Sequence, residues 1–176
     1  LVAPKLTTIG KQMFQGCTAL VNFIVPDNVT FIGERAFQGC TNLKTLTFPA
    51  SYKAETLSFG LTPFVSCPAF EGYVIEDGAS IVRTEDGTLL AGGGKVLVSL
   101  PENFTGTSYT VPDGVETISD YLFYKKTAIT SVTLPASLKK IGTAAFQGCT
   151  KLTSITLPDG FTTLGEHAFD GCTALK

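Results

Sequence analysis

Apolar and polar residues follow one another along this chain in a pattern that repeats with a short, constant period over most of its length. Residues 27–49 form one complete unit, DNVTFIGERAFQGCTNLKTLTFP, in which an Ile-Gly pair is followed by a phenylalanine, a Gly-Cys pair and leucines. Related units surround Phe14, Phe123, Phe146 and Phe169. A short fixed period with apolar residues in fixed positions predicts stacked coils that share one continuous core.

The end of each unit predicts a short β-strand. Leu46 and Phe48 alternate with Thr45 and Thr47, and a period of two places the apolar pair inward and the threonines outward. Pro49 ends the strand. Because an equivalent strand recurs once per coil, we expect these strands to pair in register as a parallel sheet.

The stretch after the Ile-Gly pair predicts a tight turn on the opposite side of the coil. Residues 34–38 are too few for a stable isolated helix but fit one helical or 3₁₀ turn, and Gly39 follows where a left-handed cap is expected. The bulkier turn side predicts that the stack curves, with the sheet on its concave surface. The expected fold class is therefore α/β: a solenoid with a curved parallel sheet of short strands and irregular, 3₁₀ or short helical turns on the convex side.

The period breaks in the middle of the chain. Phe64 and Cys67 still occupy the phenylalanine and cysteine positions, but the step from Phe37 to Phe64 is longer than the step from Phe14 to Phe37. Residues 81–90 predict a β-hairpin with Asp86-Gly87 as its turn. The glycines at 92–94 predict a second turn, so we expect a central hairpin island between regular repeats.

The repeats predict one domain. We expect a single solenoid over residues 1–176, with regular repeats at 4–49 and 107–176 and an irregular insert at 50–106. The chain starts with Leu1 rather than methionine, and it begins and ends inside a repeat. We therefore expect it to be a piece of a longer protein.

Four of the five cysteines occupy one position of the repeat: Cys17, Cys40, Cys149 and Cys172. Stacked coils place equivalent residues about 5 Å apart, which permits the disulfides Cys17–Cys40 and Cys149–Cys172. Equivalent side chains point the same way, however, and free cysteine packs well as a small apolar residue, which favours a ladder of buried thiols. Zinc is disfavoured because the chain has one histidine, His167.

Composition and charge argue against several classes of partner. Apolar residues make up 44% of the chain and charged residues 16%, which is typical of a folded domain. The net charge is −2 and the 13 basic residues are scattered, so we expect no nucleic-acid partner. No apolar run reaches the roughly 18 residues that span a bilayer, so we expect no direct membrane insertion.

We find no catalytic constellation in the sequence, and we expect no enzyme, no cofactor and no metal site. His167 shares its repeat position with Gln12, Arg35, Tyr121 and Ala144, and a position that accepts such different residues is most simply exposed. Nucleophilic catalysis needs a base held beside the nucleophile, and His167 is the one histidine available.

The repeat resembles a known family. The pattern LxxIxLPxxLxxIGxxAFxGCxx is similar to the BspA-like leucine-rich repeats of bacterial cell-surface proteins. It is carried by Leu152, Ile155, Leu157-Pro158, Phe161, Leu164-Gly165, Ala168-Phe169 and Gly171-Cys172, and it extends over about residues 4–49 and 107–176. The resemblance implies a leucine-rich-repeat solenoid and a secreted or cell-surface location. It also implies a protein partner, such as a host or bacterial surface or matrix protein.

Two hypotheses for function remain open. The first is a protein-binding or adhesion module that uses outward Ser and Thr side chains of the sheet. Its candidate residues are Thr45, Thr47, Ser131, Thr133, Ser154 and Thr156. The alternative is a structural spacer or stalk that presents another domain, because these side chains are small and lack the Trp, Tyr and Arg anchors of binding hot spots.

A second candidate patch lies in the unit that follows the insert: Tyr121, Tyr124, Lys125 and Lys126. Two lysines replace the Gly-Cys pair there, so Lys126 falls in a nominally buried position. Either the loop opens and the lysine reaches water, or the four residues form a ligand patch, since tyrosine favours interfaces.

Overall fold

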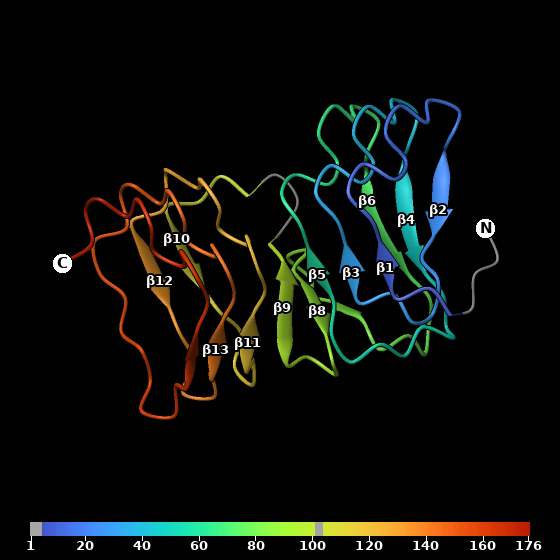
Figure 1. Cartoon of the computed structure of the whole chain (residues 1–176). Coiled ribbons are helices and arrows are strands. Elements are labelled where there is room, and N and C mark those ends of the chain that lie inside the picture. Colours follow the sequence, from blue (N-terminus) through green and yellow to red (C-terminus); the bar gives the residue numbers. More distant parts are fainter. Residues whose placement is uncertain (1–4, 101–103) are drawn as a thin grey trace. The chain divides into compact units, whose positions relative to one another are not determined.

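The structure is a computed structural model that describes residues 5–100 and 104–176. The described chain forms two compact units. Unit 1 comprises residues 5–83 and 91–93, and unit 2 comprises residues 84–90, 94–100 and 104–176. Figure 1 shows that both units are built from short strands joined by loops. The expectation of one continuous domain stays a prediction.

Unit 1 holds two parallel sheets, and each coil contributes one strand to each. The strands of these sheets are β1 (Thr8–Ile9), β2 (Asn22–Ile24), β3 (Phe31–Ile32), β4 (Thr45–Phe48), β5 (Ser58–Phe59) and β6 (Gly72–Ile75), and β7 (Val82–Arg83) belongs to neither of them. One sheet has the order β1-β3-β5 and the other β2-β4-β6. Phe23 pairs with Leu46 and Leu46 with Tyr73, so the register takes the regular step and then the longer step that the sequence predicts.

Unit 2 repeats this arrangement. Its strands are β8 (Leu89–Ala91), β9 (Val96–Ser99), β10 (Ser108–Thr110), β11 (Thr117–Ile118), β12 (Ser131–Thr133), β13 (Lys140–Ile141) and β14 (Thr163–Leu164). One parallel sheet runs β14-β13-β11-β9. The other joins β10 to β12 and continues through a parallel bridge from Ser131 to Ser154.

The expected α/β class with helical turns is wrong, because the described residues contain no helix. Residues 34–38 form a turn instead, in which the backbone N–H of Arg35 donates to Leu61 O and that of Phe37 donates to Pro63 O in the next coil. Arg35 and Gly39 both adopt positive φ, at 52° and 72°. Left-handed residues cannot continue a right-handed helix, so the amide groups turn toward the neighbouring coil. The molecule is a β-solenoid.

The second strand of each coil was also missed. The pattern predicts that Val29 and Ile32 return to the core, but the structure makes a strand, β3, around Ile32. Two residues of alternation are too few to distinguish a strand from a loop. Each coil therefore has two strand sides and one turn side, all joined to the next coil by backbone hydrogen bonds.

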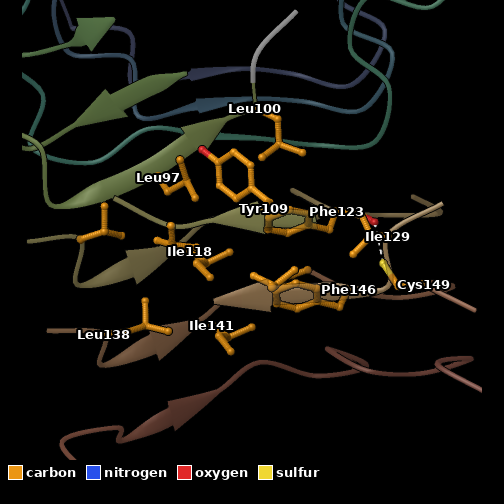
Figure 2. Packing of buried hydrophobic residues seen from close by; sticks show 14 of the residues in the cluster. Leu97, Leu100, Tyr109, Ile118, Phe123, Ile129, Leu138, Ile141, Phe146 and Cys149 are labelled. Atoms are coloured by element: carbon orange, nitrogen blue, oxygen red, sulfur yellow. Dashed lines mark hydrogen bonds between the residues drawn. The ribbon is translucent and has the colours of Figure 1, made fainter. Parts of the chain in front are cut away.

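The phenylalanines form the spine that the repeat predicts. Phe37 and Phe146 are fully buried. In unit 2, the ring of Phe146 stacks on Phe123 with centroids 4.7 Å apart and on Phe169 at 5.3 Å. Figure 2 shows the stacked Phe123 and Phe146 rings beside Ile118 and Ile141 in the core of unit 2.

The insert keeps the coil and adds length to it. The added residues in unit 1 lie between β4 and β5, where Tyr52 is fully buried and its hydroxyl donates to Val29 O. The predicted hairpin turn is present: Thr84 N–H donates to Thr88 O at 2.9 Å, and Thr88 N–H to Asp86 Oδ1 at 3.0 Å. Strands β7 and β8 flank this turn, as the sequence predicts.

Candidate binding face

Outward hydroxyl groups gather on one sheet of unit 2. The strand register places Ser108 beside Ser131 and Thr110 beside Thr133, and the bridge continues the serine row to Ser154. We call this set the hydroxyl face: Ser108, Thr110, Ser131, Thr133, Ser154 and Thr156. All six residues are exposed, while Tyr109 and Val132 between the rows are buried. Neighbouring rows are about 4.8 Å apart, the usual strand spacing.

Four of these residues were predicted from the sequence, and two were not. The structure brings Ser131, Thr133, Ser154 and Thr156 together around one shallow groove of about 460 Å³, which Leu134 and Ile155 also line. Ser108 and Thr110 were missed as site residues. They lie one repeat before Ser131 and Thr133, so the period itself was the signal that would have found them.

The hydroxyl face differs from other threonines of the solenoid in its hydrogen bonding. Thr130 Oγ1 donates to Thr107 O at 3.0 Å, and Thr153 Oγ1 donates to Thr130 O at 3.2 Å, so these side chains bind the preceding coil. Within the described part of the chain, the hydroxyls of the hydroxyl face have no such partner. Their donors and acceptors therefore remain available to a ligand.

The two predicted residues of unit 1 have different surroundings. Thr45 Oγ1 donates to Asn22 Oδ1 at 2.9 Å, which occupies its donor. Thr47 lies in register between Ile24 and Val74, whose side chains are 64% and 44% exposed. The face of unit 1 is therefore more apolar and less rich in free hydroxyls than that of unit 2.

The structure brings together three residues of the second predicted patch, Tyr121, Tyr124 and Lys125, in unit 2. The Tyr121 and Tyr124 rings meet edge to face with centroids 6.1 Å apart, and Lys125 Nζ lies 5.2 Å from the Tyr124 centroid. Lys125 is exposed, whereas Tyr121, Tyr124 and Lys126 are half-buried. Lys126 is thus not a core residue, although it occupies the position that cysteines fill elsewhere.

A sequence profile described as BspA type leucine rich repeat region matches residues 2–78 and 102–176, in six copies. The chain belongs to the BspA-type leucine-rich repeat family. A search of curated proteins found no match.

Solved structures agree with this assignment at the level of the fold. The chain resembles a leucine-rich repeat protein from Eubacterium ventriosum (TM-score 0.56, 22% identity) and the pneumococcal vaccine antigen PcpA (0.58, 20%). It also resembles a leucine rich cell surface protein from Faecalibacterium prausnitzii (0.57, 24%). The matches cover 98–99% of this chain but 57–59% of those proteins, so the BspA-type chain spans less than two thirds of their length.

The cysteines of this BspA-type chain are free, and four of them act as hydrogen-bond donors between coils. Each thiol donates to the carbonyl of the phenylalanine in the preceding coil, at 3.0–3.1 Å: Cys40 to Phe14, Cys67 to Phe37, Cys149 to Phe123 and Cys172 to Phe146. Figure 2 shows the bond from Cys149. The prediction of buried thiols is confirmed for Cys40 and Cys149. Cys172 is half-buried, and the prediction is wrong for Cys17, which is exposed in the first coil.

We expect the exposed thiol of Cys17 to react faster than the buried thiol of Cys149. Burial, helped by Cys172, raises the pKa of Cys149 from 9.0 to about 12, so the nucleophilic thiolate is scarce at neutral pH. Native protein treated with iodoacetamide at pH 8 should be alkylated at Cys17 first, with Cys149 unmodified until denaturant is added. Mass spectrometry of tryptic peptides measures both, and equal labelling of the two in native protein would contradict the buried-thiol assignment.

His167 is exposed, but its repeat position is not exposed in every coil: Ala144 is buried, and Gln12 and Tyr121 are half-buried. Its Nδ1 lies 4.0 Å from Asp170 Oδ2, beyond hydrogen-bond distance, and that oxygen already accepts a hydrogen bond from Gln147 Nε2 at 2.9 Å. The same position has positive φ in every regular coil: Gln12, Arg35, Tyr121, Ala144 and His167. The shared backbone conformation, rather than a shared chemistry, is what these residues have in common.

Across residues 5–100 and 104–176, no group of three or more His, Cys, Asp or Glu side chains is placed to hold a metal ion. In the same ranges, no helix has the length and apolar character that crossing a membrane requires.

Proposed function

We propose that this BspA-type chain is a non-enzymatic protein-binding module, and that the hydroxyl face of unit 2 contacts the partner. The observation that carries the proposal is the set of in-register hydroxyls that have no partner within the described chain. Exposed side chains on a rigid sheet lose little entropy on binding, because backbone pairing between coils already fixes their positions.

The chemistry of the face favours a modest, extended contact. Ser and Thr side chains are neutral and small, and the groove places apolar Leu134 and Ile155 beside them. Protein interfaces combine an apolar centre with polar groups that form hydrogen bonds. Large aromatic and arginine anchors are absent from the groove-lining residues, so affinity would come from several weak contacts.

We infer that the partner is a host or bacterial surface or matrix protein and that this chain works outside the cell or at its surface. The family assignment supports this location, as does the cell surface protein from Faecalibacterium prausnitzii, although its likeness establishes the fold alone. The alternative role is a spacer, favoured by the absence of large anchor side chains on the same face.

The proposal predicts a loss of binding when the face becomes bulky and charged. Thr133→Arg combined with Thr156→Arg should weaken capture of a partner from a panel of purified matrix and bacterial surface proteins by about tenfold, as hot-spot changes do. Biolayer interferometry measures this. The matched control is Thr163→Arg, an exposed threonine on the other sheet of unit 2, which should bind like the parent chain.

Two outcomes would count against the binding role. If the double variant bound a captured partner as tightly as the parent chain, the hydroxyl face would not be the contact surface. If no protein of the panel bound, and removal of one repeat left the function of the longer protein intact, the spacer role would replace the binding role.

A further inference from the structure

One coil of unit 2 departs from the repeat in consecutive positions, and the fold does not require the change. Lys126 stands where five other coils have cysteine: Cys17, Cys40, Cys67, Cys149 and Cys172. Tyr124 and Lys125 stand where the next coil has Gln147 and Gly148. Departures from an otherwise consistent repeat tend to mark functional positions, because they cost stability without a structural gain.

Lys125 bears a conformational cost that most of its equivalents avoid, Ser66 at φ 59° being the exception. The φ of Lys125 is 54°, and the same position holds glycine in four coils, at φ from 70° to 75°: Gly16, Gly39, Gly148 and Gly171. A side chain at positive φ is strained, whereas glycine is not. The Lys125 side chain also lies close to Gly148 of the next coil. A Cβ added to Gly148 would lie 3.2 Å from Lys125 Cγ, so the glycine leaves room for the lysine side chain.

The two lysines have no acidic partner in the described ranges. Other lysines do: Lys11 lies 2.8 Å from Glu34, and Lys139 lies 2.8 Å from Glu116. The acidic residue nearest in sequence, Asp120, accepts the Thr143 N–H at 2.8 Å and forms no ion pair with either lysine among the described residues. A pair of uncompensated positive charges therefore remains at this turn.

The two tyrosines pack together beside the charge of Lys125. Lys125 Nζ lies over the Tyr124 ring, and Tyr121 packs edge to face against the same ring. A cation–π contact restrains a lysine that would otherwise be free in solvent. Half-buried tyrosines are also the residue type that most often anchors protein partners.

We propose that Tyr121, Tyr124, Lys125 and Lys126 form a docking surface for an acidic segment of a protein partner. Charge complementarity selects the segment: the lysines pair with Asp or Glu side chains, and the tyrosine rings pack against the segment's backbone and aliphatic groups. This surface goes beyond the hydroxyl face and does not depend on it.

The test uses a fluorescein-labelled poly-glutamate peptide as probe and fluorescence anisotropy at low salt. The parent chain should bind the peptide, with affinity that falls as salt is added. The double variant Lys125→Gln, Lys126→Gln should bind about tenfold more weakly. The matched control, Lys140→Gln with Lys176→Gln, removes the same charge from two exposed lysines elsewhere in unit 2 and should lose less than twofold.

A single variant separates a functional patch from a structural one. Lys125→Gly introduces the residue that four other coils have at this position, so the melting temperature should rise by about 2 °C as the strain is relieved. Its peptide binding should nevertheless fall with that of the double variant. Undiminished binding by Lys125→Gly would overturn the proposal.

Three other results would also overturn it. They are no binding by the parent chain, equal losses in the double variant and its control, and tighter lysine-dependent binding of heparin than of the peptide, which would indicate a sulfated glycan instead. Variants of the hydroxyl face, such as Thr133→Arg, should leave peptide binding unchanged. Failure of this proposal is therefore distinguishable from failure of the proposed function.

Discussion

Replacing Phe146 with alanine should lower the free energy of unfolding of unit 2 by about 3–5 kcal/mol, the usual cost of deleting a fully buried aromatic ring. Phe146 has no solvent exposure and stacks between Phe123 and Phe169. Its removal opens a cavity in the middle of the spine, which backbone pairing on three sides of the coil prevents from collapsing. The effect should therefore lie near the upper end of that range.

Urea denaturation followed by circular dichroism measures the loss, and hydrogen exchange of unit 2 amides locates it. Phe169→Ala is the matched control: this ring is half-buried and stacks on one neighbour, so its loss should cost clearly less. Phe146→Leu should fall between the two. If Phe146→Ala and Phe169→Ala were equally mild, the phenylalanine stack would not be the main support of unit 2.

The spine could be predicted from sequence because it depends on spacing alone. Within unit 2, Phe123, Phe146 and Phe169 recur at one fixed interval, and a stack of equal coils leaves one way to bring them together. The parallel register follows from the same argument, so pairs such as Phe23 with Leu46 need no further information.

The turn side could not be predicted in the same way. Ala36 and Phe37 have ordinary helix propensities, and nothing local to the sequence announces that Arg35 adopts positive φ. Tertiary contacts favour the turn over a helix, because the turn amides donate to carbonyls of the next coil, as Phe37 N–H does to Pro63 O at 2.9 Å. Propensity is a weak prior when such contacts compete with it.

The candidate site, too, could be predicted only in part. Alternation predicts that Thr133 and Ser131 point outward, and the register predicts that they align with neighbouring rows. Which hydroxyls stay free depends on contacts that no pattern records: Thr130 binds a carbonyl of the preceding coil and Thr133 does not. Thr45 and Thr47 belong to unit 1, whereas the other four candidates belong to unit 2, a division that the repeat pattern does not indicate.

The phenylalanine carbonyls explain why one repeat position favours cysteine. Phe123 O accepts the Lys126 N–H of its own turn at 3.0 Å and the Cys149 thiol of the next coil at 3.1 Å. A cysteine there fills apolar space and uses the carbonyl's second lone pair. Valine would fill the space without the hydrogen bond, so packing and polarity together account for this position.

Gly142 should tolerate substitution poorly, and Gly142→Ala should cost about 1–3 kcal/mol of unfolding free energy through overpacking. A Cβ on Gly142 would lie 2.6 Å from Asp120 N and 2.7 Å from the carbonyl carbon of Ser119. Both atoms are backbone, and backbone hydrogen bonds join this part of each coil to its neighbours, such as Gly142 N–H to Ile118 O at 2.8 Å, so neither atom can move aside without opening the coils. The Ile-Gly pair of the repeat is thus a requirement for close stacking rather than for an unusual φ.

Gly10 supplies the matched control, because it occupies the same repeat position in the first coil and no atom lies within 4 Å of its would-be Cβ. Gly10→Ala should leave stability unchanged or raise it by about 0.5 kcal/mol, since alanine loses less conformational entropy on folding. Thermal and urea unfolding of the two variants test the difference directly. If Gly142→Ala and Gly10→Ala changed stability equally, alanine would act through backbone conformation. Close contact between coils would then not be the reason for glycine at this repeat position.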